Sequence, residues 1–274
     1  MRSAWDRTVA CSGSAMQNDR PVIFLLHGLG GSARTFDDVA ERLLPDFEPA
    51  AIDLPGFGDA ANAVDTSIPA TADAVAAAIR RRAARRWLLV GHSMGGKIAS
   101  VVAARSLAGE PGLSGLRGVV LLAGSPPSPE PMDESRRQEM MGWVAHGPMA
   151  ESSARKFIAD NTGAPLPPSE NESAIGDLMR TSPNAWLAWL DRGSREDWSE
   201  TVGVVELPAL VVVGSEDGDL GEVGQRATNC HIYPRARLLS EAGAGHLLPF
   251  ERPDAVAKAI KRFWIDEVGA IDWP

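Results

Sequence analysis

The sequence predicts an α/β fold in which a mostly parallel sheet is flanked by helices and carries an inserted helical lid. Three observations support this prediction. Short runs of apolar residues recur along the chain, and segments with the apolar spacing of helices separate them. One long interval in the second half of the chain reads as helical and contains no such run.

The apolar runs are short, rich in Val, Ile and Leu, and not interrupted by charges. These properties are typical of strands buried on both faces of a parallel sheet. The predicted strands are Val22–Leu26, Ala50–Ile52, Trp87–Val90, Val119–Leu122 and Leu210–Val213.

Helical spacing of apolar residues follows most of these runs. The predicted helices are Arg34–Leu44, Thr71–Arg82, Gly96–Leu107 and Asp254–Val268. In the third of these, Ile98, Val101 and Val102 form the i, i+3, i+4 stripe that a helix lays on a sheet. Strands that alternate with helices predict a parallel sheet with helices on both faces.

The alternation breaks after the strand at Val119–Leu122. The proline-rich segment 126–131 cannot continue a helix or a central strand, and helical patterns with four tryptophans then run to about Glu206. We therefore expect a core domain made of residues 1–125 and 207–274, with residues 126–206 inserted as a helical lid.

Composition excludes several classes of function. The chain has 274 residues and a net charge of −9, so it lacks the basic surplus that nucleic acid or an anionic membrane attracts. Residues 1–20 lack the apolar segment of a signal peptide, and the apolar runs are far shorter than the roughly 20 residues of a membrane span. Cys11 and Cys230 fit neither a metal site nor a disulfide framework. We expect a cytoplasmic protein with free thiols and no nucleic-acid or membrane partner, and the oligomeric state stays open.

The segment Gly91-His92-Ser93-Met94-Gly95 has the G-x-S-x-G pattern and lies between a predicted strand and a predicted helix. A serine at such a junction sits on a sharp turn that makes its hydroxyl protrude, and flanking glycines remove side chains that would clash. The pattern therefore predicts that Ser93 is a nucleophile.

These residues resemble those of the α/β-hydrolase family. The segment His27-Gly-Leu-Gly-Gly-Ser32 is similar to the oxyanion loop of that family, and Asp53-Leu-Pro-Gly-Phe-Gly58 is similar to the turn after its next strand. The segment Gly91–Lys97 is similar to the elbow of small bacterial serine carboxylesterases. The resemblance extends from Pro21 to Val268, is weakest in the lid, and implies the α/β-hydrolase fold.

The resemblance also implies roles for individual residues. The backbone N–H groups of Leu29 and Met94 are expected to stabilise the oxyanion that attack by Ser93 creates. His246, in a glycine-rich loop before the last helix, is expected to be the base. His27 is expected to brace its loop, and His92 to point away from the site.

Asp217 is the expected orienting acid, because it lies three residues beyond Gly214 at the exit of a predicted strand. The order Ser93, Asp217, His246 is the one that the fold requires. Glu216 and Asp219 remain alternatives, since no proline follows the acid as it often does in the family.

These features predict a serine hydrolase that cleaves carboxylic esters of small, apolar acyl or aryl substrates through an acyl-enzyme. A thioesterase or lactonase, a C–C bond hydrolase or lyase with the same triad, and a non-catalytic ligand-binding protein are the alternatives. A serine at the elbow argues against the aspartate-based dehalogenases and epoxide hydrolases, and no motif indicates a cofactor or a metal. The expected pocket residues are Trp143, Trp186, Trp189 and Leu247, although packing between lid and core is favoured for any single tryptophan.

Overall fold

A computed structural model describes residues 20–269, and its centre is a sheet of six parallel strands in the order β2-β1-β3-β4-β5-β6. The strands are β1 Val22–Leu26, β2 Glu48–Ile52, β3 Trp87–His92, β4 Leu116–Leu122, β5 Ala209–Gly214 and β6 Ala236–Glu241. The predicted α/β fold is therefore confirmed. The edge strand β6 was not among the predicted strands.

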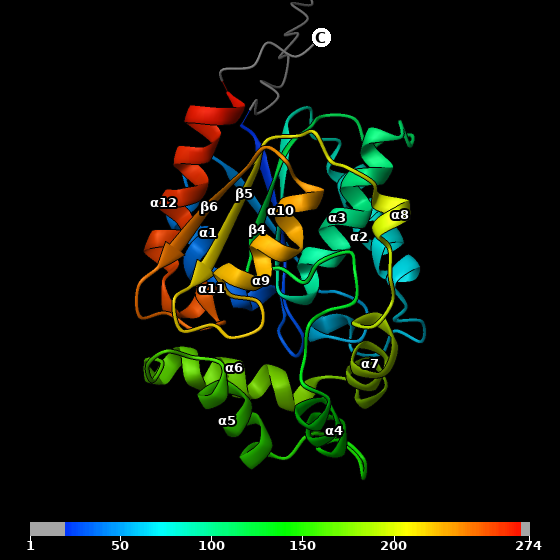
Figure 1. The fold of residues 1–274 in the computed structure, drawn as a ribbon, viewed down its shortest axis with the longest axis vertical. Helices are drawn as coiled ribbons and strands as arrows, with labels where there is room; N and C mark the ends of the chain where they lie inside the picture. Colours follow the sequence, from blue (N-terminus) through cyan, green and yellow to red (C-terminus); the bar gives the residue numbers. More distant parts are fainter. Residues whose placement is uncertain (1–19, 270–274) are drawn as a thin grey trace, which may run out of the picture.

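Helices cover both faces of the sheet (Figure 1). One face carries α1 Asp37–Leu43, α11 Leu248–Glu251 and α12 Pro253–Phe263, and the other carries α2 Ile68–Arg82, α3 Met94–Leu107 and α8 Ser199–Val202. The short helices α9 Glu222–Ala227 and α10 Asn229–Ile232 lie between β5 and β6 in the chain, and π-helical residues Trp264–Val268 extend α12. Two 3₁₀ turns, Ala33–Phe36 and Gly58–Ala60, complete the core.

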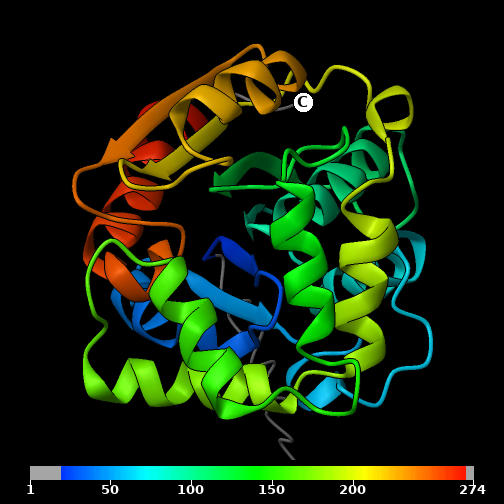
Figure 2. The same cartoon turned by 60° about the horizontal axis from the view of Figure 1, so that its bottom comes forward.

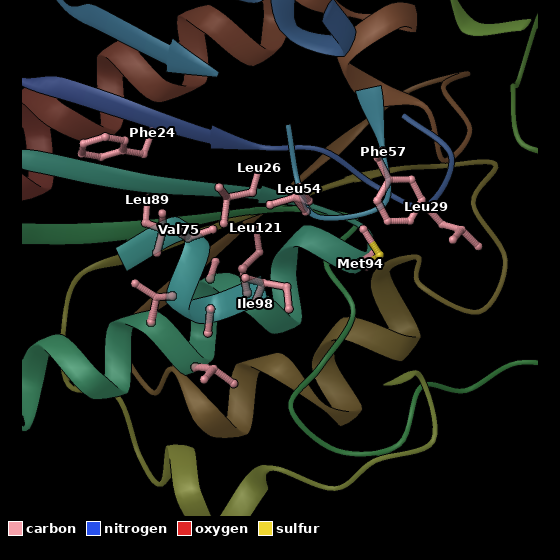
Figure 3. Packing of buried hydrophobic residues seen from close by; sticks show 14 of the residues in the cluster. Phe24, Leu26, Leu29, Leu54, Phe57, Val75, Leu89, Met94, Ile98 and Leu121 are labelled. Carbon is pink, nitrogen blue, oxygen red and sulfur yellow. The ribbon is translucent and has the colours of Figure 1, made fainter. Parts of the chain in front are cut away.

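The core has two halves because successive residues of a strand point to opposite faces of the sheet. Phe24 and Leu26 of β1 belong to one apolar cluster, and Ile23 and Leu25 belong to the other. Figure 3 shows the first cluster, in which Ile98 of α3 packs beneath the strands. Burial of these faces is the main apolar contribution that fixes the helices on the sheet.

Of the five α-helices between β4 and β5 in the chain, all within the interval predicted to form the lid, α8 packs on α3 and the other four form a separate layer. These four are α4 Glu134–Gly142, α5 Glu151–Asp160, α6 Pro168–Arg180 and α7 Pro183–Ala188, which continues into the π-helical residues Trp189–Gly193. They lie together beyond one end of the sheet (Figures 1 and 2). The division into a core domain and a lid domain at residues 126 and 206 stays a prediction.

Buried polar contacts hold this helical layer on the core. Asp177 of α6 is 1% exposed and accepts hydrogen bonds from Ser32 Oγ at 2.6 Å and from Arg34 Nη2 at 2.7 Å. Lys97 of α3 is fully buried and donates from Nζ to the carbonyl oxygens of Gly193 at 3.0 Å and Glu196 at 2.8 Å. A buried charge that loses its partners is costly, so these contacts fix the position of the layer.

The structure also bears on the expectations about membrane spans and cysteines. In residues 20–269 no helix is long and apolar enough to cross a membrane. Cys230 is a half-buried free thiol. Cys11 lies outside the described residues, and so do residues 1–19, on which the expectation about a signal peptide rests.

Close approach of main chains shapes the turn after β3. A Cβ atom on Gly95 would lie 2.4 Å from the carbonyl oxygen of Leu26, and a Cβ atom on Gly91 would lie 2.4 Å from that of Gly95. Any side chain at these positions would force α3 away from the sheet. The turn therefore depends on glycine for space.

We predict that Gly95→Ala destabilises the fold, because the added methyl group meets main chain, which cannot rotate aside. Overpacking of this kind costs about 1–3 kcal/mol, and thermal denaturation followed by circular dichroism should show a fall of several degrees in Tm. Gly176→Ala is the control: nothing lies within 4 Å of its added Cβ atom, and alanine within a helix is about 0.5–1 kcal/mol more favourable than glycine. Equal Tm values for Gly95→Ala and the parent would contradict the argument.

Candidate active site

Ser93 occupies the junction between β3 and α3 in a backbone conformation that non-glycine residues rarely adopt. Its φ is 50° and its ψ is −122°. Hydrogen bonds enforce this conformation: the Ser93 N–H donates to Leu122 O at 3.0 Å, and Ser93 O accepts from the N–H groups of Gly96 at 2.7 Å and Ser125 at 2.8 Å. Strain that is held in this way is typical of functional residues.

The loop after β1 passes directly over Ser93. A Cβ atom on Gly28 would lie 2.9 Å from Ser93 Cβ, so only glycine allows this approach. Leu29 follows in this loop, and Met94 begins α3 immediately after the serine. Among the described residues, neither of their N–H groups has a hydrogen-bond acceptor. Both remain available to an oxygen atom beside Ser93.

His246 and Asp217 are brought together from the loops that follow β6 and β5. His246 Nδ1 donates to Asp217 Oδ2 at 2.8 Å, which leaves Nε2 as the unprotonated nitrogen of the neutral ring. Burial alone lowers the pKa of His246, but the Asp217 carboxylate and its hydrogen bond outweigh burial and raise it. Burial likewise raises the pKa of Asp217, but the charge and hydrogen bond of His246 prevail and lower it.

The two rival acids make no contact of this kind. Glu216 and Asp219 both line the same cavity as Asp217, and in the described part of the chain neither is hydrogen bonded to His246. The Glu216 carboxylate accepts from Ser215 Oγ instead. The geometry therefore favours Asp217 as the partner of the imidazole.

The loop that carries His246 is held from the lid side. Asn161, at the end of α5, accepts hydrogen bonds on its carbonyl oxygen from the N–H groups of His246 at 2.9 Å and Leu247 at 3.2 Å. Glu251 accepts from the N–H groups of Gly245 at 3.0 Å and Gly163 at 2.7 Å, and so bridges the same two segments. The inserted helices thus fix the position of the imidazole as well as covering it.

The other four histidines have different environments. His27 is buried, accepts from the Leu54 N–H on Nε2 at 3.0 Å and donates from Nδ1 to Gly28 O at 2.8 Å, so it braces its loop as expected. His92 donates from Nε2 to His246 O at 2.9 Å, and burial together with the neighbouring His246 lowers its pKa to about 3. His146 and His231 are exposed.

One cavity contains Ser93, Asp217 and His246 and has a volume of about 100 Å³. Its apolar wall comes from the oxyanion-type loop and from the lid: Leu29, Met132, Met140, Phe157 and Trp189. Of the predicted pocket residues, Trp189 therefore lines the cavity. Leu247 lines a smaller neighbouring cavity with Gly28 and Phe157.

Trp143 and Trp186 are not among the residues that line this cavity, and their contacts are of the packing kind that the sequence favoured for any single tryptophan. Trp186 is fully buried, donates from its indole nitrogen to Met140 O at 2.8 Å, and packs against Phe157 at 5.6 Å and Trp143 at 6.2 Å between ring centroids. These two tryptophans form a second layer behind the cavity wall. Their bulk supports Phe157 and Met140, which do face the cavity.

Among the cavity residues that the sequence analysis missed are two ionisable ones, Glu130 and Arg136. Glu130 lies within the proline-rich segment 126–131 and Arg136 lies shortly after it, and no periodic pattern or motif marks either residue. Arg136 donates from Nη2 to Asn161 Oδ1 at 3.0 Å and forms no ion pair with a carboxylate in residues 20–269. A clustering of His, Cys, Asp or Glu suited to a metal ion is absent from that part of the chain.

Comparison with known proteins gives a family match over most of the chain. The model of the alpha/beta hydrolase family matches residues 23–259. The esterase from Exiguobacterium antarcticum is 16% identical and superposes with a TM-score of 0.77 over 89% of this chain and 91% of that chain. At that identity the superposition shows the shared fold.

Two curated relatives are more similar in sequence. The 2-succinyl-6-hydroxy-2,4-cyclohexadiene-1-carboxylate synthase of Serratia proteamaculans is 39% identical over 90% of this chain and 94% of its own length. The pimeloyl-[acyl-carrier protein] methyl ester esterase of Neisseria meningitidis is 30% identical over 71% of this chain and 75% of its own length.

We predict that Asp217→Asn lowers kcat by a factor on the order of 10⁴, because an amide favours the wrong tautomer of His246. Asp219→Asn and Glu216→Gln are matched controls that line the same cavity and should stay within about tenfold of the parent, since loss of a charge exposed to water changes a reaction barrier little. Steady-state kinetics on one activated ester compares all three variants. A severe loss in Asp219→Asn with a mild one in Asp217→Asn would reassign the acid.

The pH dependence of kcat/KM should report His246. Only the neutral imidazole accepts a proton from Ser93, and its pKa is raised above the ordinary 6.5, so activity should rise with pH through one ionisation above that value and then reach a plateau. In Asp217→Asn the residual activity should show this ionisation at lower pH, because the carboxylate that raises the pKa is gone. A profile that stays flat through the acid range points to a different base.

Proposed function

Because the chain belongs to the alpha/beta hydrolase family, we propose that it is a serine hydrolase that cleaves carboxylic esters through an acyl-enzyme on Ser93. The observation that carries this proposal is the hydrogen bond between His246 Nδ1 and Asp217 Oδ2 in the cavity that Ser93 also lines. Such a pair supplies the oriented base that a serine hydroxyl needs in order to attack.

In the acylation step Ser93 Oγ attacks the ester carbonyl carbon while His246 Nε2 takes the hydroxyl proton. The negative charge moves to the carbonyl oxygen, where the N–H groups of Leu29 and Met94 stabilise it by several kcal/mol in total. Collapse of this intermediate breaks the bond to the alcohol oxygen, and protonated His246 gives its proton to the departing alcohol. The products of this step are the free alcohol and the ester of Ser93.

In the deacylation step a water molecule replaces the alcohol. His246 removes a proton from the water, the oxygen attacks the acyl carbon, and the same two N–H groups stabilise the second oxyanion. Ser93 then leaves with the proton from His246, and the acid is released. Asp217 keeps the imidazole in the required tautomer and stabilises its charged form throughout.

The substrate is proposed to be small, with an apolar acyl or aryl group. The cavity of about 100 Å³ limits its size, and Met132, Met140 and Phe157 from the lid supply an apolar wall. The methyl ester esterase from Neisseria supports ester chemistry in a relative of this sequence. A cytoplasmic location belongs to the same proposal.

A second candidate is a lyase-type reaction at the same triad. It is favoured by the Serratia synthase, which is similar over 90% of this chain and whose named product carries a carboxylate. The cavity offers one side chain suited to a carboxylate, Arg136, whose guanidinium forms no ion pair in the described residues. In that reaction His246, oriented by Asp217, would take a proton from a C–H bond of the substrate, the electron pair of that bond would form a C=C double bond, and the group on the adjacent carbon would leave with its bonding electrons.

The test measures both reactions with one preparation. We expect the parent enzyme to hydrolyse p-nitrophenyl esters of short acids, and we expect Ser93→Ala to lose about three or more orders of magnitude in kcat with an unchanged Tm. A fluorophosphonate probe should label the parent and not the variant.

Synthase activity is assayed in parallel, with the Serratia enzyme as the positive control for product formation. Ester turnover without synthase product supports the first candidate, and the reverse result supports the second. Residual esterase activity of Ser93→Ala within tenfold of the parent would contradict the assignment of the nucleophile.

A further inference from the structure

Glu130 is a buried carboxyl group in the cavity wall that the proposed mechanism does not use. It lies in the loop between β4 and α4, is 8% exposed, and lines the cavity together with Ser93 and His246. Its main-chain N–H donates to Ser194 O at 2.7 Å, which anchors the residue to the lid. Carboxyl groups are almost never buried in this way without a specific partner.

Its two carboxyl oxygens are not equivalent. Oε2 accepts a hydrogen bond from Ser125 Oγ, and Ser125 is fully buried beside the elbow. Oε1 has no hydrogen-bond partner among the described residues, yet it is not one of the sealed polar atoms of the interior. One oxygen is therefore fixed by the protein while the other remains accessible from the cavity.

The cationic side chains near Glu130 donate their hydrogen bonds to other residues. Lys97 of α3 donates to Gly193 O and Glu196 O, and Arg137 of α4 donates to Leu190 O and Ser194 Oγ. Neither forms an ion pair with Glu130. His246 faces it from the loop after β6.

The protonation of the carboxyl group follows from these surroundings. Burial raises the pKa of Glu130, and Ser125, His246, Lys97 and Arg137 only partly oppose that shift. The raised pKa widens the pH range over which the carboxyl group keeps a proton that it can donate.

We propose that Glu130 is a substrate-selecting residue, whose free Oε1 donates a hydrogen bond to an oxygen atom that the substrate carries in addition to its ester group. The proposal deepens the proposed function, on which it rests, by naming oxygen-bearing esters as the preferred class. A purely apolar ester leaves the buried O–H group without a partner, which disfavours its binding. An ester with a keto or ether oxygen within reach satisfies it.

The experiment compares three esters of similar size: ethyl butanoate, ethyl 3-oxobutanoate with an added oxygen on the acyl side, and 2-methoxyethyl butanoate with one on the alcohol side. Hydrolysis is followed by pH-stat. We expect the parent to prefer one of the oxygen-bearing esters in kcat/KM by about tenfold, the scale of one buried hydrogen bond. In Glu130→Ala this preference should vanish while hydrolysis of ethyl butanoate persists.

Glu130→Gln is the matched variant, because its amide keeps a donor of nearly the same shape without an ionisable proton. It should retain the preference at every pH, whereas the preference of the parent should decline as pH rises through the ionisation of Glu130. Equal losses on all three esters in Glu130→Ala, or a preference that Glu130→Gln also loses, overturns the proposal.

Binding separates this proposal from the proposed function. Ser93→Ala with and without Glu130→Ala is titrated with the same esters by calorimetry, so the selectivity of Glu130 is measured without turnover. If the parent hydrolyses no ester, the proposed function fails, and the binding ratio still decides the role of Glu130. Thermal melts of each variant exclude misfolding as the cause of a loss, and Glu130→Gln serves if Glu130→Ala does not fold.

Discussion

The site depends on how closely the chain after β3 turns back against the end of β1. Gly95 packs on the carbonyl oxygen of Leu26, and Gly28 passes over Ser93 with no room for a side chain. These two approaches hold Ser93 at a φ of 50°, where the hydroxyl stands clear of the strand. They also bring the loop of Leu29 next to Ser93 and Met94. The proposed nucleophile and the proposed oxyanion donors thus depend on a single packing constraint, and a methyl group at Gly95 disturbs both.

The inserted helices do more than cover this turn. The carbonyl oxygen of Asn161 accepts from the N–H groups of His246 and Leu247, and Glu251 joins Gly163 to Gly245. The position of the imidazole is therefore set jointly by the sheet domain and by the end of α5. Lys97 and Asp177 are buried charges that fasten the same helices elsewhere. A large outward movement of this layer would have to break contacts of the base itself, so substrate entry and base positioning are coupled.

The sequence predicted most of the sheet and the three residues of the candidate triad. The physical reasons for these predictions also explain why one strand and several cavity residues were missed. Val22–Leu26 is buried on both faces and reads as a continuous apolar run, whereas β6 is a half-exposed edge strand with polar residues and was missed. Ser93 was found because its turn requires a motif. Glu130 and Arg136 were missed because their place in the cavity arises from the tertiary packing of the proline-rich stretch and the residues just after it. For Trp186 the sequence left cavity wall and packing open, because an aromatic residue suits a wall and the layer behind it equally well.

Two histidines with ring centroids only 5.3 Å apart show how the site selects its base. His92 is sealed from water, its unprotonated Nδ1 has no hydrogen-bond donor, and burial lowers its pKa to about 3. His246 is largely buried but borders the cavity, and Asp217 accepts from its Nδ1 and raises its pKa. If both rings became charged, their repulsion would oppose the second protonation, so a neutral His92 leaves His246 free to take the serine proton. The acid partner, rather than burial or proximity to Ser93, decides which imidazole can act.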